Sequence, residues 1–229
     1  MAVLDTAQSA LERGIDAAMR VQRPAVQRHI ARVRARHPEA TPNQVVGLLE
    51  THYQRLVAGI GAAAGASAAA PGLGTAAGLA LNVAEISAFL EATSLFCLAV
   101  AEVHGIPLDD ARRRRALLYV VLLGDSGSKI VGKVMGAPAK EWGRLLEDAT
   151  PIAVVETANK LLGQRFLTRA GRKQGALLLG RELPLGVGAL IGGVGNHRLA
   201  SEAIKAARKA FGPAPVDFPR ERRRLGMRG

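Results

Sequence analysis

The segment LVAGIGAAAGASAAAPGLGTAAGLALN, residues 56–82, consists mostly of alanine, glycine and leucine and carries no charged side chain. Pro71 and Gly72 divide it into arms of about 15 and about 10 residues, and each is shorter than the roughly 20 residues that a helix needs to cross a bilayer. Alanine is the strongest helix former, whereas proline interrupts a helix. The segment therefore predicts a helical hairpin that bends at Pro71.

Pairs of glycines four positions apart occur in this hairpin and again near the C-terminus. The pairs are Gly61 and Gly65, Gly74 and Gly78, and Gly188 and Gly192. This spacing places both glycines on one helix face, which allows two backbones to approach closely in membranes and in soluble bundles alike. We therefore expect these six glycines to pack helices together.

The segments on either side of the hairpin also have helical patterns. Thr41 and Pro42 are typical of a helix start, and Gly105 is typical of a helix end. Helices are predicted over residues 3–22, 24–37, 42–70, 82–104, 107–124, 128–135, 138–148, 151–163, 165–180 and 197–211. No segment alternates like a strand, so the prediction is an all-α helical bundle with Ala/Gly-rich hairpins and no β-sheet.

Charge divides the chain into three parts. The chain has 31 basic and 19 acidic residues, a net charge of +12, and no basic residue lies between positions 56 and 111. The predicted domains are a basic amphipathic helical arm over 1–40, a helical domain over 41–211 and a disordered basic tail over 212–229. A strongly basic protein is attracted to polyanions such as anionic lipid, nucleic acid or acidic proteins.

The arginines of the arm and the tail are the candidate binding residues for such a polyanion. They are Arg28, Arg32, Arg34 and Arg36 in the arm, and Arg222, Arg223 and Arg224 in the tail. Aromatic residues are almost absent from both segments, which disfavours base stacking on single-stranded nucleic acid. Anionic lipid head groups are therefore the preferred ligand.

Motifs for catalysis are incomplete in this sequence. The segment YVVLLGDSGSK, residues 119–129, resembles a phosphate-binding loop, but neither register from Gly124 or Gly127 supplies both the second glycine and the Lys-Ser/Thr pair. The single cysteine, Cys97, lies in an apolar run and is expected to be buried, and the five histidines are scattered without metal-ligand spacing. We expect no catalytic, cofactor-binding or metal-binding residues, and no enzymatic activity.

One group of polar residues is the first place where a hidden site could form. Its members, Glu85, Glu91, Glu102 and His104, follow the hairpin within a single predicted helix. Ionisable residues that converge in a pocket would indicate an enzyme.

The order of the two glycine-rich segments resembles the EcsC family over about residues 45–211. The resemblance rests on GAAAGASAAAPGLGTAAGLALNVAEISAFLEATSLFCLAVAEVHGI, and on LPLGVGALIGGVGNHRLASEAIKAARKAF much later in the chain. His197 departs from the pattern, because an aromatic residue is expected after the asparagine. The resemblance implies an all-helical intracellular protein associated with membrane transport or secretion systems, and no catalytic residues.

Together these features predict a cytoplasmic, non-enzymatic protein that docks peripherally on anionic membranes, at the inner face of the cell membrane. Docking on a membrane transport or secretion system is part of the same expectation. An adaptor that binds an acidic protein partner and a nonspecific nucleic-acid binder remain as alternatives. No cofactor is expected, and the oligomeric state is left open.

Overall fold

The structure is a computed structural model, and it describes residues 15, 18–20, 23–68, 75–106, 109–136, 143, 150–178 and 187–219. In these residues the secondary structure is helical, without strands, which confirms the all-α prediction. The helices are α2 (Arg23–Arg36), α3 (Pro42–Ala68), α4 (Thr75–Val103), α5 (Ala111–Leu123), α6 (Asp125–Met135), α7 (Ile152–Leu178) and α8 (Val187–Phe211).

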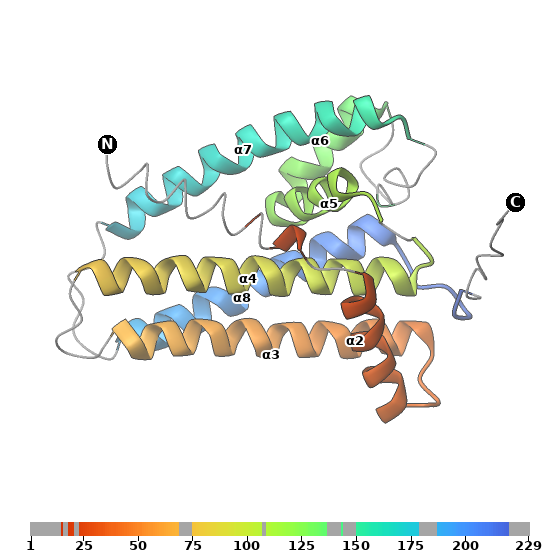
Figure 1. The fold of residues 1–229 in the computed structure, drawn as a ribbon, viewed down its shortest axis with the longest axis horizontal. Coiled ribbons are helices and arrows are strands. Elements are labelled where there is room, and N and C mark those ends of the chain that lie inside the picture. Colours follow the sequence, from red (N-terminus) through yellow and green to blue (C-terminus); the bar gives the residue numbers. More distant parts are fainter. Residues whose placement is uncertain are drawn as a thin grey trace, which may run out of the picture.

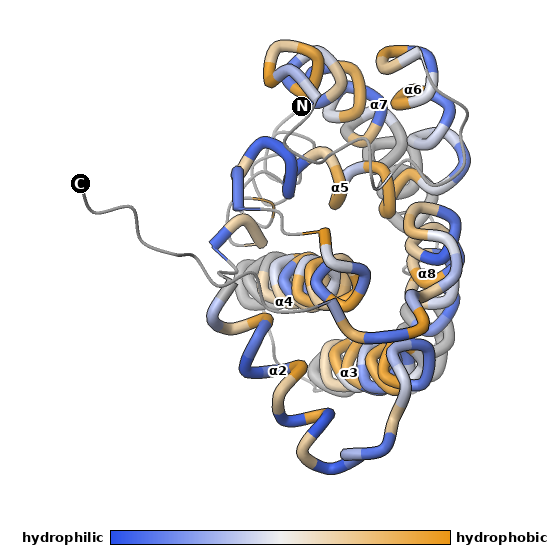
Figure 2. The backbone as a smooth tube through the Cα atoms, turned by 90° about the vertical axis from the view of Figure 1, so that its right-hand side faces the viewer, coloured by the Kyte–Doolittle hydropathy of each residue, from blue (hydrophilic) through white to orange (hydrophobic). Residues whose placement is uncertain are grey.

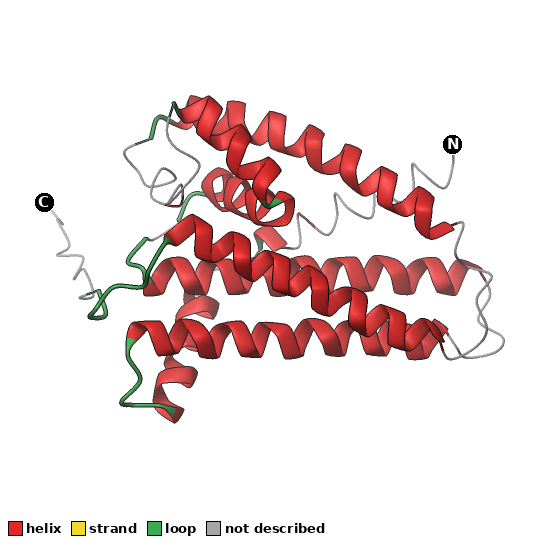
Figure 3. Ribbon diagram, turned by 180° about the vertical axis from the view of Figure 1, so that it is seen from behind, coloured by secondary structure: helices red, strands yellow, loops and turns green. Residues whose placement is uncertain are grey.

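Two layers of helices make up the bundle (Figure 1). The long helices α3, α4 and α8 form one layer, and α3 packs most extensively against α8 and then against α4. Helices α5, α6 and α7 form the other layer, and the view along the bundle in Figure 2 separates the two. Helix α2 crosses α3 and α4 near one end, on the side opposite α8, which Figure 3 shows from behind.

The first predicted arm of the hairpin lies in α3, close to the helix predicted over 42–70, whereas the second arm belongs to a longer helix than expected. Helix α3 begins with a reciprocal cap, because Thr41 Oγ1 accepts a hydrogen bond from the Gln44 amide while Gln44 Oε1 accepts one from the Thr41 amide. Helix α4 continues from Thr75 through Asn82 to Val103, so the short second arm and the helix after it are a single element of 29 residues. The bend at Pro71 lies outside the described residues.

Length alone would let part of α4 cross a membrane. The stretch Ala84–Val103 is long and apolar enough to do so, but 61% of it is buried inside the bundle. A buried core helix passes the same test of length and composition. The stretch begins after the predicted hairpin, residues 56–82, so it does not test the expected length of the hairpin arms, and burial explains its apolar composition.

Two further helices are also longer than predicted. Helix α7 runs through Gly163 without a break, where two helices were expected, and α8 begins at Val187, although this helix was predicted to begin at residue 197. A glycine inside a helix costs only about 1 kcal/mol relative to alanine, so packing can keep the helix continuous. The helix predicted over 138–148 lies outside the described residues, apart from Gly143.

Glycines also make the corner between α5 and α6. Gly124 has a left-handed φ of 59°, and its amide donates to the carbonyls of Val120 and Val121 at the end of α5. A Cβ on Gly127 would lie 2.8 Å from the Val120 Cα, so the two helices touch backbone to backbone. The segment that resembles a phosphate-binding loop is therefore a helix corner.

One main core unites α2 with the rest of the bundle. Val26, Ile30 and Val33 of α2 are buried in the same cluster as residues of α3, α4, α5, α7 and α8. Helix α2 is thus part of the domain, and the predicted boundary at residue 40 does not separate it from the rest. Cys97 is buried in this core as expected, and burial raises the pKa of its thiol.

The first residues after α8 are also packed. Phe218 is partly buried against the main core, and Pro219 lies where a Cβ on Gly105 would be, at the end of α4. The predicted disorder from residue 212 is therefore wrong for residues 212–219. Gly105 ends α4 as predicted, with a φ of 74° and a bond from the Ile106 amide to the Ala101 carbonyl.

Candidate anion-binding surface

Helix α2 has one face in the core and one face in solvent. Val26, Ile30 and Val33 are spaced by four and three positions, so they share the buried face. Each such side chain contributes roughly 1.5–3 kcal/mol when fully buried, which is enough to hold a 14-residue helix against the bundle. The solvent face is therefore carried on a firmly packed helix.

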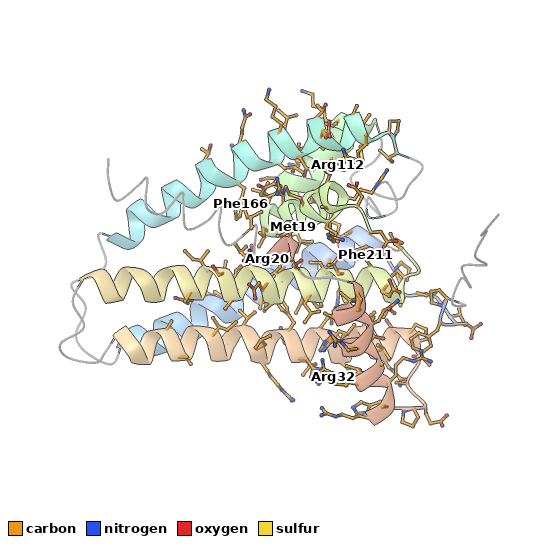
Figure 4. The ribbon with its side chains drawn as sticks, viewed as in Figure 1. Met19, Arg20, Arg32, Arg112, Phe166 and Phe211 are labelled. Carbon is orange, nitrogen blue, oxygen red and sulfur yellow. The ribbon has the colours of Figure 1, made fainter. Side chains whose placement is uncertain are left out.

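Three of the predicted arginines form a row on that solvent face. Arg28, Arg32 and Arg36 are four positions apart and exposed, and Figure 4 labels Arg32 in the middle of the row. The Arg28 Nε donates to the Pro24 carbonyl at 3.3 Å, and the Arg32 Nε donates to the Arg28 carbonyl at 3.2 Å. These bonds orient the side chains along the helix. We call Arg28, Arg32 and Arg36 the arginine row.

The arginine row is not neutralised by the part of the chain that the structure describes. No carboxylate among those residues lies within ion-pair distance of the three guanidinium groups. Other cations of the bundle are paired: Arg112 with Asp110 and Glu156, and Lys209 with Asp125. The positive charge of the row is therefore available to an external anion.

The fourth predicted arginine of α2 has a different role. The guanidinium carbon of Arg34 lies 4.1 Å from the centre of the Phe218 ring, a cation–π contact between α2 and the C-terminal segment. Arg34 is exposed but points to the opposite flank of α2 from the row. This contact was not predicted from the sequence, although phenylalanine is rare in the chain, with five residues, and Phe218 could have been singled out for that reason.

Two histidines border the arginine row. The rings of His29 on α2 and His52 on α3 meet edge to face with centroids 6.2 Å apart. Burial lowers the pKa of His29, and the charges of Arg32 and His52 lower it further. His29 is therefore neutral at pH 7, and the row owes its charge to the arginines.

The predicted group of polar residues on α4 is not brought together. Glu85 and Glu102 are 17 positions apart on one helix, which separates them by about 25 Å. Glu102 Oε1 accepts a bond of 3.3 Å from Gln27 on α2, and Glu91 is exposed. His104 Nδ1 lies 2.8 Å from the Val100 carbonyl, and its ring lies against Phe211. These four residues therefore do not form a site.

The remaining predicted residues have mixed outcomes. Gly61 is buried in α3. Gly65, Gly78, Gly188 and Gly192 lie within helices, but their surroundings are not among the described features. Gly74 and the tail residues Arg222, Arg223 and Arg224 lie outside the described residues. Among the described glycines, close approaches occur instead at Gly105, Gly127 and Gly143, and a Cβ on Gly143 would lie 2.7 Å from the Phe211 ring.

In the described ranges, no group of three or more His, Cys, Asp or Glu side chains is arranged to bind a metal ion. Comparisons of the chain with protein-family models, with curated proteins and with solved structures found no match.

Proposed function

We propose that this protein docks peripherally on anionic membrane surfaces through the arginine row of α2. The observation that carries the proposal is the arginine row itself: three exposed guanidinium groups on one face of a packed helix, without carboxylate partners in the described residues. Guanidinium groups bind phosphate oxygens through paired hydrogen bonds, so they suit lipid head groups.

The expected electrostatic attraction between the arginine row and an anionic bilayer is modest. A basic residue near an anionic bilayer contributes about 1 kcal/mol, so the row supplies about 3 kcal/mol. This is weak binding on its own, and Arg222, Arg223 and Arg224 would add to it as part of the same proposal. The expected behaviour is therefore reversible and sensitive to salt.

The proposed binding is electrostatic rather than insertive. Val57 and Gly61 of α3 are buried, and most of the apolar stretch of α4 is enclosed by the bundle. Inserting these surfaces in lipid would require the main core to open. We therefore propose that the hairpin stays in the bundle while α2 contacts the head groups.

The cellular role follows from this binding as part of the proposal. A cytoplasmic protein of this kind would bind the inner face of the cell membrane, where anionic lipids are found. The resemblance to the EcsC family adds an association with a membrane transport or secretion system. We propose binding rather than catalysis, and the dispersal of the polar group on α4 supports this choice.

Co-sedimentation with vesicles tests the proposal. The purified protein is mixed with neutral or with anionic vesicles at low and at high salt, and the bound fraction is measured. Binding to anionic vesicles alone that is lost at high salt is the expected result. Binding that survives high salt would mean insertion of an apolar segment. Absence of binding in every condition would overturn the proposal. An acidic protein would then be the favoured partner of the arginines.

A further inference from the structure

An open groove lies between α6 and α7, on the layer that does not contain α2. It has a volume of about 400 Å³. Ile130 and Val134 of α6 and Leu161 of α7 give it an apolar floor, and Lys133 and Arg165 lie at its edges. The groove is thus far from the arginine row in sequence and belongs to other helices.

Part of the apolar floor is open to solvent. Leu161 is 43% exposed and is among the four most exposed large hydrophobic side chains of the described residues. Its neighbour along the chain, Leu162, is fully buried against the main core, so α7 is anchored by one face while it presents Leu161 on the next. Ile130 and Val134 beside it are partly buried, so the groove presents one exposed and two partly exposed apolar side chains.

The edges of the groove carry one sign of charge. Lys133 and Arg165 are both exposed, and no acidic side chain lines the groove. Neither cation forms an ion pair with any carboxylate in the part of the chain that the structure describes. A ligand that fits must therefore combine apolar groups with negative charge.

The shape of the groove selects the kind of ligand. Its α7 side runs from Leu161 to Thr168, about 10 Å or two helical turns. Because the groove is open along its length, it could not enclose most of a small molecule, as ligand pockets do. A third helix laid between α6 and α7 would instead cover the floor with one apolar stripe.

We propose that this groove binds an acidic amphipathic helix of a partner protein. The partner helix would place apolar side chains at positions i, i+4 and i+7 on Ile130, Val134 and Leu161. Its flanking carboxylates would pair with Lys133 and Arg165. The net charge of +12 on the chain favours encounter with such a partner.

A synthetic peptide is the probe for this site. An alanine-rich peptide of about 20 residues would carry leucines at i, i+4 and i+7 and glutamates on both flanks. Its binding is measured by fluorescence anisotropy, beside a second peptide with lysines in place of the glutamates. We expect saturable binding of the acidic peptide and none of the lysine peptide.

Variants of the full chain locate the binding. Leu161→Asp, and separately the double variant Lys133→Glu/Arg165→Glu, should each weaken binding at least tenfold. Leu199→Asp on α8 removes a leucine of similar exposure, 38% against 43%, and Arg198→Glu/Lys205→Glu makes the same charge change on α8. Both controls should keep the affinity within twofold.

Three results would overturn the proposal. One is the absence of saturable binding by the acidic peptide. Another is equal weakening by Leu161→Asp and Leu199→Asp, which would indicate nonspecific contact. The third is a dimer in analytical ultracentrifugation that Leu161→Asp dissociates, since the occupant would then be a second copy of the chain. The Lys133→Glu/Arg165→Glu variant retains the arginine row, so its binding to anionic vesicles tests the proposed function of α2 separately from the groove.

Discussion

Arg208 near the end of α8 donates two hydrogen bonds to Glu50 on α3, from Nε at 2.7 Å and from Nη2 at 2.5 Å. The Glu50 side chain is only 9% exposed, whereas that of Arg208 is 67% exposed. The carboxylate is therefore buried between two helices and meets its charge partner at the surface. This pair joins the two helices that pack most extensively in the fold.

Removing the arginine should cost stability, because it leaves a buried carboxylate without its donor. We expect Arg208→Met to lower the free energy of unfolding by about 1–2 kcal/mol in urea denaturation. Arg198→Met, an exposed arginine on the same helix, should change it by less than about 0.5 kcal/mol. The double variant Glu50→Leu/Arg208→Met should recover part of the loss. Equal losses for Arg208→Met and Arg198→Met would contradict this role.

Charge reversal on α2 tests the proposed membrane contact with a matched control. Arg28→Glu/Arg32→Glu on α2 and Arg198→Glu/Lys205→Glu on α8 each replace two cations by two anions, so both lower the net charge from +12 to +8. Only the α2 variant should lose affinity for anionic vesicles, by at least about tenfold in partition coefficient. Equal losses would show that net charge, and not the arginine row, drives binding.

Backbone contact at the α5–α6 corner predicts opposite effects for two glycine substitutions. A Cβ at Gly127 would meet the Val120 backbone, so Gly127→Ala should destabilise the fold by about 1–3 kcal/mol. No heavy atom lies within 4 Å of the Cβ position at Gly47 in α3, so Gly47→Ala should stabilise it by about 0.5–1 kcal/mol. Thermal or urea unfolding of the two variants measures both effects. Destabilisation by Gly47→Ala would contradict the open space at that position.

His29 predicts how stability depends on pH. Its pKa in the fold is lowered below its ordinary value of 6.5, mainly by burial and further by Arg32 and His52. The unfolded chain therefore binds a proton at this residue more readily than the native protein does, so stability falls as the pH drops through 6.5. His29→Gln should lose less stability than the wild type between pH 7.5 and pH 5 in urea titrations. His197→Gln, exposed on α8, should behave as the wild type does.

Local signals in the sequence were sufficient for the ends of several helices. Thr41 and Pro42 start α3, and Gly105 ends α4, because a cap depends on neighbouring backbone groups and on glycine's access to positive φ. The same local reasoning failed at glycines inside helices. It predicted a break in α7 near Gly163 and too late a start for α8. At both places tertiary packing outweighs the low helix propensity of glycine.

Contacts between distant segments were beyond the reach of local patterns. Glu50 and Arg208 are 158 positions apart, and neither has a neighbour in sequence that signals the pair. The arginines of the row were predicted only as members of a basic group that included Arg34, although four-residue intervals place Arg28, Arg32 and Arg36 on one helix face. Helix periodicity alone separates Arg34 from that row, but its contact with Phe218 depends on where residues 212–219 pack.

The contact of Phe218 with Arg34 also joins α2 to the segment after α8, which lies 184 positions later in the chain. Pro219, the next residue, lies where a Cβ on Gly105 would be, so the same short segment contacts the end of α4 as well as α2. Displacing α2 from the bundle would break the contact with Phe218. Local opening of α2 and release of residues 212–219 are therefore expected to be a single cooperative event.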